Sequence, residues 1–335
     1  MEKLLEVKNL ETSFKTNVGE VHSVRGVSFH LGQGEALGIV GESGCGKSVT
    51  MMSIMRLIDS NGRIVNGDII FDGKDISKVK DSEMNSIRGN DIGMIFQDPM
   101  TSLNPVFTIG DQLMEPLLKH KGMSKEEARK EAIEMLGLVG IPSPEKRMKQ
   151  YPHEFSGGMR QRAMIAMSLI CKPKLIIADE PTTALDVTIQ AQILDLMKDL
   201  KNKLNTSIIL ITHDLGVVAD LCSRINVMYG GIIVETGTTE DIFYRGRHPY
   251  TWGLLGSVPN PKEITKEKLK PIEGQPPDLL NPPTGCPFTA RCDYAMKICI
   301  EKQPPQFEVG ENHKCSCWLC HEDAPNVESP IRRDK

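Results

Sequence analysis

The stretch GESGCGKS, at residues 41–48, combines the residue types that hold phosphate. It fits the pattern G-x-x-x-x-G-K-[ST] between a predicted strand and a predicted helix, which is the context that this pattern requires. Its glycines let backbone N–H groups close around phosphate oxygens, Lys47 can reach the β- and γ-phosphates, and the Ser48 hydroxyl can ligate Mg²⁺. The stretch therefore predicts a nucleotide site. The residues that we expect to contact the nucleotide are Gly41, Glu42, Ser43, Gly44, Cys45, Gly46, Lys47, Ser48 and Val49.

Two acidic residues end the hydrophobic run KLIIADE at 174–180. A strand here would deliver Asp179 and Glu180 at its carboxyl end. Asp179 can help to hold Mg²⁺ without contacting the ion directly, and Glu180 can act as general base on the attacking water. Solvated acids at strand ends are common, and this run alone would be weak evidence for a nucleotide site. It supports such a site because the same chain contains the phosphate-binding pattern at residues 41–48.

A second anion-binding nest is predicted in FSGGMRQR, at 155–162. Ser156 is followed by Gly157 and Gly158 at the start of a helical run, where backbone N–H groups point outward. One chain thus has two phosphate sites of different construction. A single nucleotide does not easily need both.

These motifs, in this order, resemble the ATP-binding cassette (ABC) family over about residues 4–255. The resemblance implies an ATPase in which two cassettes face head to tail, so that the Ser-Gly-Gly run of one completes the γ-phosphate site of the other. It also implies roles for four further residues. These are Gln97, contacting Mg²⁺ and the attacking water; Asp186, crossing the dimer interface; His213, holding the γ-phosphate; and Phe14, stacking on adenine.

The sequence departs from the common family pattern at two places. Phe155 and Met159 replace the usual Leu and Gln of the Ser-Gly-Gly signature. Phe14 replaces the more usual Tyr, which keeps the stacking and removes a hydroxyl bond.

Two further stretches narrow the resemblance within the family. QDPMTSLNPVFTIGDQL at 97–113 and RHPYTWGLLGSVP at 247–259 resemble ATPase subunits of bacterial dipeptide and oligopeptide importers. This implies a second ATPase subunit, identical or different, two membrane permease subunits that dock at 98–117, and indirectly an extracytoplasmic peptide-binding protein. The chain would then lie at the cytoplasmic face of the membrane. The alternative is a soluble regulatory or repair ATPase with a redox-sensing cysteine cluster.

Composition limits the classes of partner. With 335 residues, 39% of them hydrophobic, the chain can bury a sizeable core. The formal net charge of −4 provides no basic field for nucleic acid. No run approaches the roughly 20 apolar residues that span a bilayer. We expect a protein that is neither secreted nor membrane-spanning by itself and that binds no nucleic acid.

Six of the nine cysteines lie between residues 286 and 320. The other three, Cys45, Cys171 and Cys222, are scattered as in a protein of a reducing compartment, which disfavours disulfides in the tail. Structural zinc prefers cysteines two to four residues apart, and only the group around Cys317 fits that spacing. Iron–sulfur clusters tolerate wider spacing. An iron–sulfur cluster, zinc and no metal all remain open on spacing alone.

The importer resemblance extends to this tail. Related subunits have a C-terminal extension like GCPFTARCDYAMKIC followed by a later H…CW, and some hold a four-iron cluster there. The resemblance implies a [4Fe-4S] cluster with zinc as the alternative, and it leaves Cys315 and Cys320 without a role. The implied ligands are Cys286, Cys292, Cys299 and Cys317. Because Cys292 and Cys299 would lie far apart along one helix, we expect Cys292 at or just before a helix start.

Alternating strand and helix patterns must position these residues. Short β-type runs fill 4–40, an Asp-Gly hairpin is predicted in GDIIFDGKDI, and a helix at 124–139 begins at a Ser cap. SIILITHD and RINVMYGGIIVETG predict a buried strand and a hairpin. Together they predict an α/β fold with a mostly parallel sheet.

The predicted organisation is therefore a P-loop ABC ATPase domain at 1–256 with an antiparallel β subdomain and a helical subdomain at about 98–172. A small, loop-rich cysteine domain follows at 257–335, where Pro becomes frequent and periodicity fades. Because it lies outside the cassette, we expect Cys286→Ser to destabilise this tail while sparing nucleotide binding at Lys47.

Overall fold

The computed structural model describes residues 2–98, 102–183, 186–257 and 271–330. The chain forms two compact units. The first unit comprises residues 1–2, 32–35 and 78–210, and the second unit comprises residues 3–31, 36–77 and 211–335. Helices and strands alternate, as predicted for an α/β protein.

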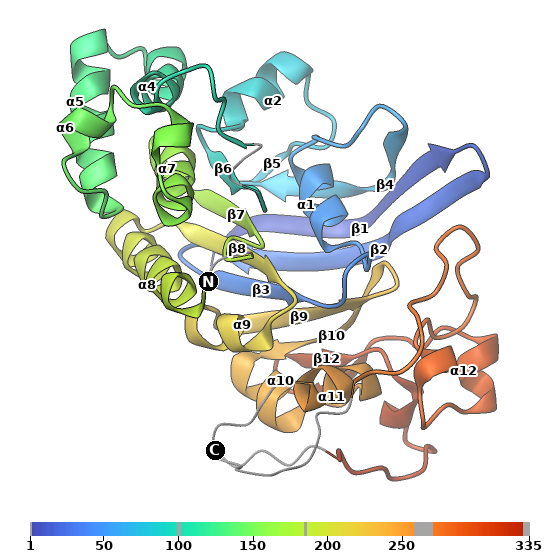
Figure 1. Ribbon diagram of the computed structural model, residues 1–335. Coiled ribbons are helices and arrows are strands. Elements are labelled where there is room, and N and C mark those ends of the chain that lie inside the picture. The colour runs from blue at the N-terminus through green and yellow to red at the C-terminus, as the bar shows by residue number, and fades with distance from the viewer. Residues whose placement is uncertain (1, 99–101, 184–185, 258–270, 331–335) are drawn as a thin grey trace. The chain divides into compact units, whose positions relative to one another are not determined.

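Five strands of the second unit lie side by side in the order β11-β12-β10-β9-β3 (Figure 1). β3 (Ala36–Val40) pairs in parallel with β9 (Arg224–Tyr229), which forms an antiparallel hairpin with β10 (Ile232–Thr238). All of β3 is buried, as in a strand covered on both faces. β3 is one of the short β-type runs predicted within residues 4–40, and the hairpin predicted in RINVMYGGIIVETG is confirmed.

A separate antiparallel sheet in the second unit has the order β2-β1-β4-β5. Its strands are β1 (Lys3–Thr16), β2 (Gly19–Gly32), β4 (Gly62–Phe71) and β5 (Lys74–Asp75). Asp72 and Gly73 join the last two strands with φ angles of 49° and 77°, the positive values that an Asp-Gly hairpin turn requires. The antiparallel lead-in and the Asp-Gly hairpin are confirmed.

The second unit also contains helices that follow its strands. They are α1 (Lys47–Ile54), α9 (Leu215–Leu221), α10 (Thr239–Arg245) and α11 (Pro249–Gly256). α1 begins directly after the loop that leaves β3. The predicted strand, loop and helix order around residues 41–48 is therefore present.

In the first unit, β7 (Leu175–Asp179) pairs in parallel with β6 (Ile92–Ile95), and β8 (Ser207–Thr212) is the neighbour of β7 on its other side. Helices make up most of the remainder of this unit, and Figure 1 shows α4 to α7 grouped together. They are α2 (Asp81–Ile87), α4 (Ile109–His120), α5 (Lys125–Leu138), α6 (Pro144–Arg147), η1 (Pro152–Glu154), α7 (Gly157–Leu169) and α8 (Val187–Leu204).

The helix predicted at 124–139 begins as its sequence indicates. The Ser124 hydroxyl accepts a hydrogen bond from the backbone N–H of Glu127, and the Glu127 carboxylate accepts one from the backbone N–H of Ser124. This capping box satisfies two N–H groups that an α-helix leaves unpaired.

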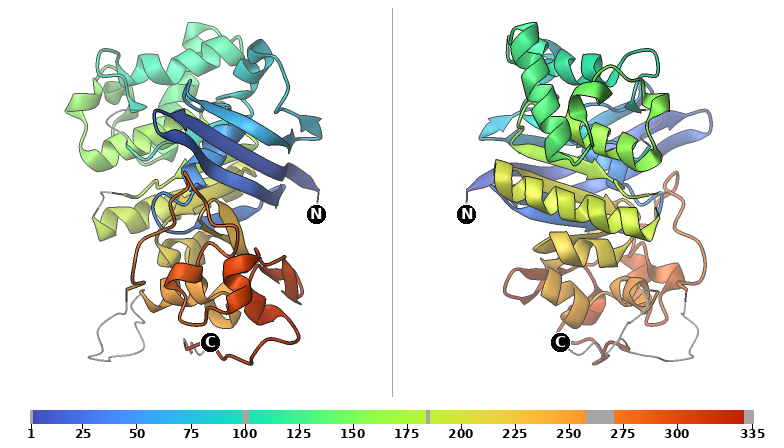
Figure 2. Two further views of the ribbon diagram at one scale, coloured as in Figure 1. Left: turned by 90° about the vertical axis from the view of Figure 1, so that its right-hand side faces the viewer. Right: turned by 60° about the vertical axis from the view of Figure 1, so that its left-hand side comes forward.

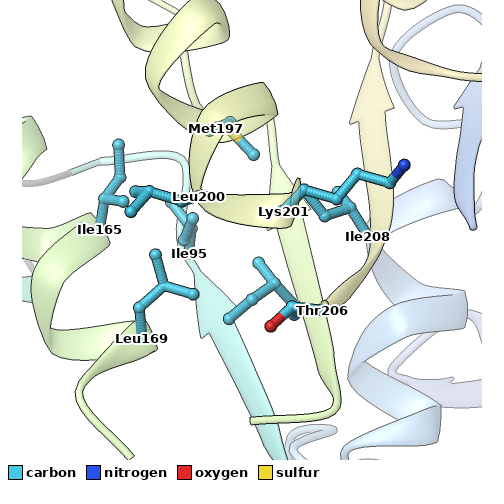
Figure 3. Close-up of a pocket in the computed structure, with 9 residues that line it drawn as sticks. Ile95, Ile165, Leu169, Met197, Leu200, Lys201, Thr206 and Ile208 are labelled. Carbon is cyan, nitrogen blue, oxygen red and sulfur yellow. The ribbon is translucent and has the colours of Figure 1, made fainter. Parts of the chain in front are cut away.

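An apolar hollow of about 250 Å³ lies in the core of the first unit between β6, β7, β8, α7 and α8. Figure 3 shows aliphatic side chains around it and Lys201 extending away from them. Thr206 is the other polar residue of the lining. Because a ligand site needs several convergent polar groups, this hollow is a packing feature.

The C-terminal residues add short elements to the second unit. They are η2 (Thr289–Arg291), α12 (Lys297–Glu301), β11 (Phe307–Gly310), β12 (His313–Cys315) and η3 (Trp318–Cys320). β12 pairs with β10 through Glu235↔Cys315 and Thr236↔Lys314. Both views in Figure 2 show this orange and red part of the chain beside α10 and α11. We call residues 271–330 the extension.

Glu235 of β10 is a fully buried carboxylate that binds three segments together. Its Oε1 accepts hydrogen bonds from the backbone N–H of Arg247 at 2.6 Å and pairs with His313 Nε2 at 2.8 Å. Its Oε2 accepts from the backbone N–H of His248 at 3.1 Å and from Thr251 Oγ1 at 2.5 Å. Such a set of partners offsets the cost of burying a charge.

Across the described residues, no helix combines the length and the apolar character that crossing a bilayer requires.

Candidate functional site

The loop at 41–48 surrounds the start of α1 in the second unit. Lys47 is 5% exposed, and its ammonium donates hydrogen bonds to the carbonyl oxygens of Gly41 at 2.7 Å and Glu42 at 2.9 Å. The loop thus holds a cation at the N-terminus of a helix, where backbone N–H groups also favour negative charge. Ser48, the next residue, is exposed. This combination can attract phosphate oxygens.

At two positions of this loop only glycine fits, both because neighbouring backbone atoms lie too close for a Cβ and because the φ angle is positive. A Cβ on Gly41 would lie 2.2 Å from the carbonyl oxygen of Met228, and a Cβ on Gly46 would lie 2.4 Å from that of Ser23. Their φ angles are 154° and 100°, in a region that L side chains rarely adopt. The loop therefore depends on glycine at both positions.

The acidic residues at the end of β7 lie in the first unit. Asp179 is buried, and Glu180 has a φ angle of 46°. Glu180 Oε2 accepts hydrogen bonds from Gln97 Nε2 and Thr183 Oγ1, each at 2.9 Å. A left-handed conformation in a non-glycine residue is strained and is often kept at functional sites. Gln97 and Glu180, 83 positions apart in the sequence, are thus joined by a hydrogen bond.

The Ser-Gly-Gly run forms the start of α7 in the same unit. The Ser156 hydroxyl accepts a hydrogen bond from the backbone N–H of Met159 at 3.4 Å, and Ser156 and Gly157 are exposed. A Cβ on Gly158 would lie 3.4 Å from Ile189 of α8. Asp186 caps α8 by accepting from the backbone N–H of Ile189 at 3.0 Å. The run therefore presents a helix N-terminus beside the start of α8.

Two other predicted contact residues lie in the second unit. His213 is an exposed residue directly after β8, and Asp214 next to it caps α9 through the backbone N–H of Gly216 at 2.8 Å. Phe14 is half-buried near the end of β1, where a Cβ on Gly62 would lie 2.6 Å from its ring. Gly62 leaves room for this aromatic ring.

Four cysteines of the extension line one hollow of about 300 Å³ in the second unit. They are the four that the sequence implied as ligands, namely Cys286, Cys292, Cys299 and Cys317. Burial raises the pKa of the Cys286 thiol, and it raises that of Cys292 to about 11. Neighbouring cysteines add to both shifts. Thiols gathered in this way need a cation to become thiolates.

In the described part of the chain, no three His, Cys, Asp or Glu side chains form a group that could hold a single metal ion. Cys299 lies in α12, while Cys292 directly follows the short helix η2 and precedes the first residue of α12 by five positions. We expected Cys292 at or just before the start of a helix. This expectation is wrong, because five positions separate Cys292 from the start of α12. The reason is that residues 292–296 form a turn, with the backbone N–H of Ala295 donating to the carbonyl oxygen of Cys292.

Cys315 and Cys320 do not line this hollow. They form their own pair, in which burial raises the pKa of Cys315 and the hydrogen bond from Cys315 lowers the pKa of Cys320. The two cysteines that the importer resemblance left over are thus separate from the other four.

His248, which sequence reasoning missed, also lines the four-cysteine hollow. Burial lowers its pKa to about 4, so its ring is neutral near pH 7. Its Nδ1 accepts a hydrogen bond from the backbone N–H of Tyr250 at 3.0 Å, which places the ring proton on Nε2. Among the described residues, buried Nε2 has no hydrogen-bond partner. A buried donor without an acceptor is costly, and it suits an acceptor within the hollow.

Comparison with known families identifies two regions. Residues 24–183 match the family model described as ABC transporter, and residues 234–299 match the one described as Oligopeptide/dipeptide transporter, C-terminal region.

Among curated proteins, the chain is 61% identical to the oligopeptide transport ATP-binding protein OppD of Bacillus subtilis, over 98% of this chain and 92% of that protein. It is 59% identical to the dipeptide transport ATP-binding protein DppD of the same organism, over 95% of each chain. Among solved structures, a dimeric ATP-binding cassette bound to ADP and phosphate is similar with a TM-score of 0.63 and 29% identity. That likeness covers 70% of this chain and 98% of that one.

Proposed function

The chain belongs to the ABC ATPases that are ATP-binding subunits of oligopeptide and dipeptide transporters, and on that premise we propose that it powers peptide import through separate permease subunits. The structural observation that carries the proposal is Glu180, held by Gln97 at the end of β7. The 61% identity to an oligopeptide-transport subunit supports this function over a regulatory or repair ATPase.

We propose that the loop around Lys47 binds the phosphates of ATP. The Ser48 hydroxyl would supply a hard oxygen ligand for Mg²⁺, and the Asp179 carboxylate would help to hold the ion without contacting it directly. When bound, this ion neutralises charge on the phosphates. Glu180 accepts a proton from the attacking water, and Gln97 and His213 orient that water. Phe14 supplies an aromatic face for adenine.

The exposed start of α7 supports the proposed head-to-tail pairing with a second ATPase subunit. Ser156, Gly157 and Gly158 present backbone N–H groups that can complete the γ-phosphate site of that subunit, and Asp186 lies beside them. The second subunit is either a copy of this chain or a different chain.

Exposed apolar side chains support docking of a permease. Val106 and Phe107, within the predicted docking segment 98–117, are 71% and 53% exposed; residues 99–101 of that segment lie outside the described residues. Aromatic residues are enriched at protein interfaces. The protein would then act at the cytoplasmic face of the membrane, with an extracytoplasmic peptide-binding protein as an indirect partner.

We propose that the four-cysteine hollow holds a [4Fe-4S] cluster, with zinc as the alternative. Four thiols lining one space would suit a cluster, because the larger inorganic core of a cluster tolerates wider ligand spacing than a single zinc ion does. The Nε2 proton of His248 suits a cluster sulfide, which accepts hydrogen bonds. Cys286, Cys292, Cys299 and Cys317 would hold the cluster, and its binding would stabilise a loop-rich segment with little core.

ATP hydrolysis by variants tests the nucleotide chemistry. We expect Glu180→Gln to bind ATP and to lose nearly all turnover, because the general base is removed while the phosphate loop is intact. Lys47→Ala should instead weaken ATP binding itself. Asp195→Asn, an exposed acid on α8, is the matched control and should keep wild-type turnover. Wild-type turnover in Glu180→Gln would remove Glu180 from this role.

The transport role has its own test. Co-purification of the chain with its permease subunits should yield a complex whose ATP hydrolysis rises with peptide. Hydrolysis that no peptide stimulates in such a complex would contradict peptide import.

A further inference from the structure

Arg291 connects the extension to the phosphate loop within the second unit. Its side chain is 4% exposed, and its guanidinium forms a two-pronged ion pair with Glu42. Nη1 lies 2.5 Å from Oε2, and Nη2 lies 2.9 Å from Oε1. Paired hydrogen bonds of this kind combine charge with a fixed geometry.

The other donors of Arg291 are also occupied. Nε donates to the carbonyl oxygen of Glu273 at 2.8 Å, Nη2 to that of Ile272 at 2.9 Å, and Nη1 to the Tyr229 hydroxyl at 3.2 Å. The guanidinium carbon lies 5.8 Å from the centre of the Tyr229 ring. The hydrogen bond with Glu42 raises the pKa of Arg291 above its ordinary value, so the side chain stays charged. These contacts therefore hold Arg291 in place in addition to its ion pair with Glu42.

Glu42 is itself part of the phosphate loop. Its backbone N–H donates to the Tyr250 hydroxyl at 2.8 Å, and its carbonyl oxygen accepts from Lys47 at 2.9 Å. A carboxylate anchored here without a partner would repel the negative phosphates of a nucleotide. The negative charge of Glu42 therefore has to be neutralised by a cation other than Lys47, so that Lys47 can bind phosphate.

We infer that Arg291 is a positioning residue that neutralises Glu42 and so keeps the phosphate loop receptive to ATP. The extension thereby contributes to nucleotide affinity without touching the nucleotide. Lys47 stays available for phosphate, because its contacts in the loop are to backbone carbonyl oxygens and to the Cys45 sulfur.

The same arginine lies within the cysteine segment. Arg291 ends η2, which occupies the short connection between Cys286 and Cys292. Phe288, in that connection, lines the four-cysteine hollow and contacts the Tyr250 ring at a centroid distance of 5.4 Å. A group bound in the hollow would therefore add, through η2 and Phe288, to the contacts that hold Arg291, a step that rests on the proposed cluster.

Equilibrium binding of ATP to the full-length chain tests the charge pairing. Arg291→Gln should weaken ATP binding by about tenfold, as expected for one unpaired charge several ångströms from the phosphates. The double variant Arg291→Gln with Glu42→Gln should recover most of this loss, because the repelling carboxylate is gone. Arg291→Lys should fall between Arg291→Gln and wild type, since it keeps the charge and loses the paired geometry.

Two controls separate this role from a structural one. Lys297→Gln breaks an exposed ion pair with Glu301 in the same extension and should leave ATP binding unchanged. Thermal unfolding of every variant reports on stability alone. Wild-type affinity in Arg291→Gln would overturn the inference, and so would a double variant that binds ATP as weakly as Arg291→Gln.

The link to the hollow needs a second measurement. Cys286→Ser should weaken ATP binding in the wild-type protein, whereas the sequence alone led us to expect unchanged binding. In the double variant Arg291→Gln with Glu42→Gln, Cys286→Ser should have little further effect on ATP binding. Equal effects in both backgrounds, or none in either, would overturn the link. Iron analysis of each preparation separates this failure from failure of the proposed cluster, because an iron-free wild-type protein would contradict the cluster alone.

Discussion

His248 lines the four-cysteine hollow with a buried Nε2 that has no hydrogen-bond partner among the described residues. It is buried and neutral, its Nδ1 is already engaged with the backbone of Tyr250, and its Nε2 proton belongs to a ring that lines the four-cysteine hollow. A hydrogen bond to a cluster sulfide stabilises the extra negative charge of the reduced state. Hydrogen bonds to the sulfurs therefore tune the potential of such clusters.

If the proposed cluster is present, His248→Phe should lower its reduction potential, because the substitution removes this donor while keeping a ring of similar size. An anaerobic redox titration followed by visible absorption measures the change, with iron content measured on the same samples. His321→Gln, at an exposed histidine directly after η3, should leave the potential unchanged. An unchanged potential in fully loaded His248→Phe would contradict the hydrogen bond.

Single residues differ in how far sequence predicts them. Lys47 and Ser48 could be assigned because a short contiguous pattern carries their chemistry, and the four cysteines because a family resemblance orders them. The Arg291–Glu42 pair could not, since 249 positions separate its members and no periodicity joins them. His248 was missed for a related reason, because its importance comes from a hydrogen bond that only the folded backbone of α11 provides.

Elements were predicted best where caps and turns have local sequence signatures. α5 is capped by Ser124, and the hairpin between β4 and β5 turns at Asp72 and Gly73, both as expected. The pairing of β12 with β10 was not expected, because β12 has three residues and no alternating pattern. Its strand character comes from the neighbouring strand.

The cap of α5 has a measurable pH dependence. Hydrogen bonds from the Ser124 backbone and side chain lower the pKa of Glu127 below its ordinary value of 4.5. Because the folded pKa is the lower one, the stabilisation is present above pH 4.5 and is lost as pH falls through the folded pKa. Ser124→Ala should lower the free energy of unfolding by about 1 kcal/mol at pH 7.

Urea unfolding at pH 7 and pH 3 measures this effect. The difference between wild type and Ser124→Ala should be smaller at pH 3, because the Glu127 carboxylate is then partly protonated. Ser82→Ala, in the first turn of α2, is a control at which no such cap is lost. A difference that grows on acidification would contradict the assignment.

At the scale of the molecule, the extension is continuous with the unit that holds the phosphate loop. Residues 3–31, 36–77 and 211–335 form one compact unit. β12 extends its sheet, Phe288 packs against Tyr229 and Tyr250, and Arg291 reaches Glu42. These contacts join the extension to the unit through hydrogen bonds, aromatic packing and charge.

A chain ending at Gly256 should therefore be poorly folded. It would leave Glu235 without His313, β10 with an open edge and the rings of Tyr229 and Tyr250 uncovered, and buried groups left unpaired are costly. Yield of soluble protein and cooperativity of thermal unfolding measure the effect. A chain ending at residue 325 removes only the last residues and should behave as wild type. A soluble 1–256 chain that binds ATP with wild-type affinity would contradict this expectation.

The partners of Glu235 also have a consequence for synthesis on the ribosome. The carboxylate and three of its donors, from residues 247, 248 and 251, emerge within a short interval, whereas His313 emerges more than sixty residues later. A nascent chain thus contains every nucleotide-binding motif while its central buried carboxylate still lacks one partner. The buried hydrogen-bond set of Glu235 is therefore complete only after His313 has been synthesised.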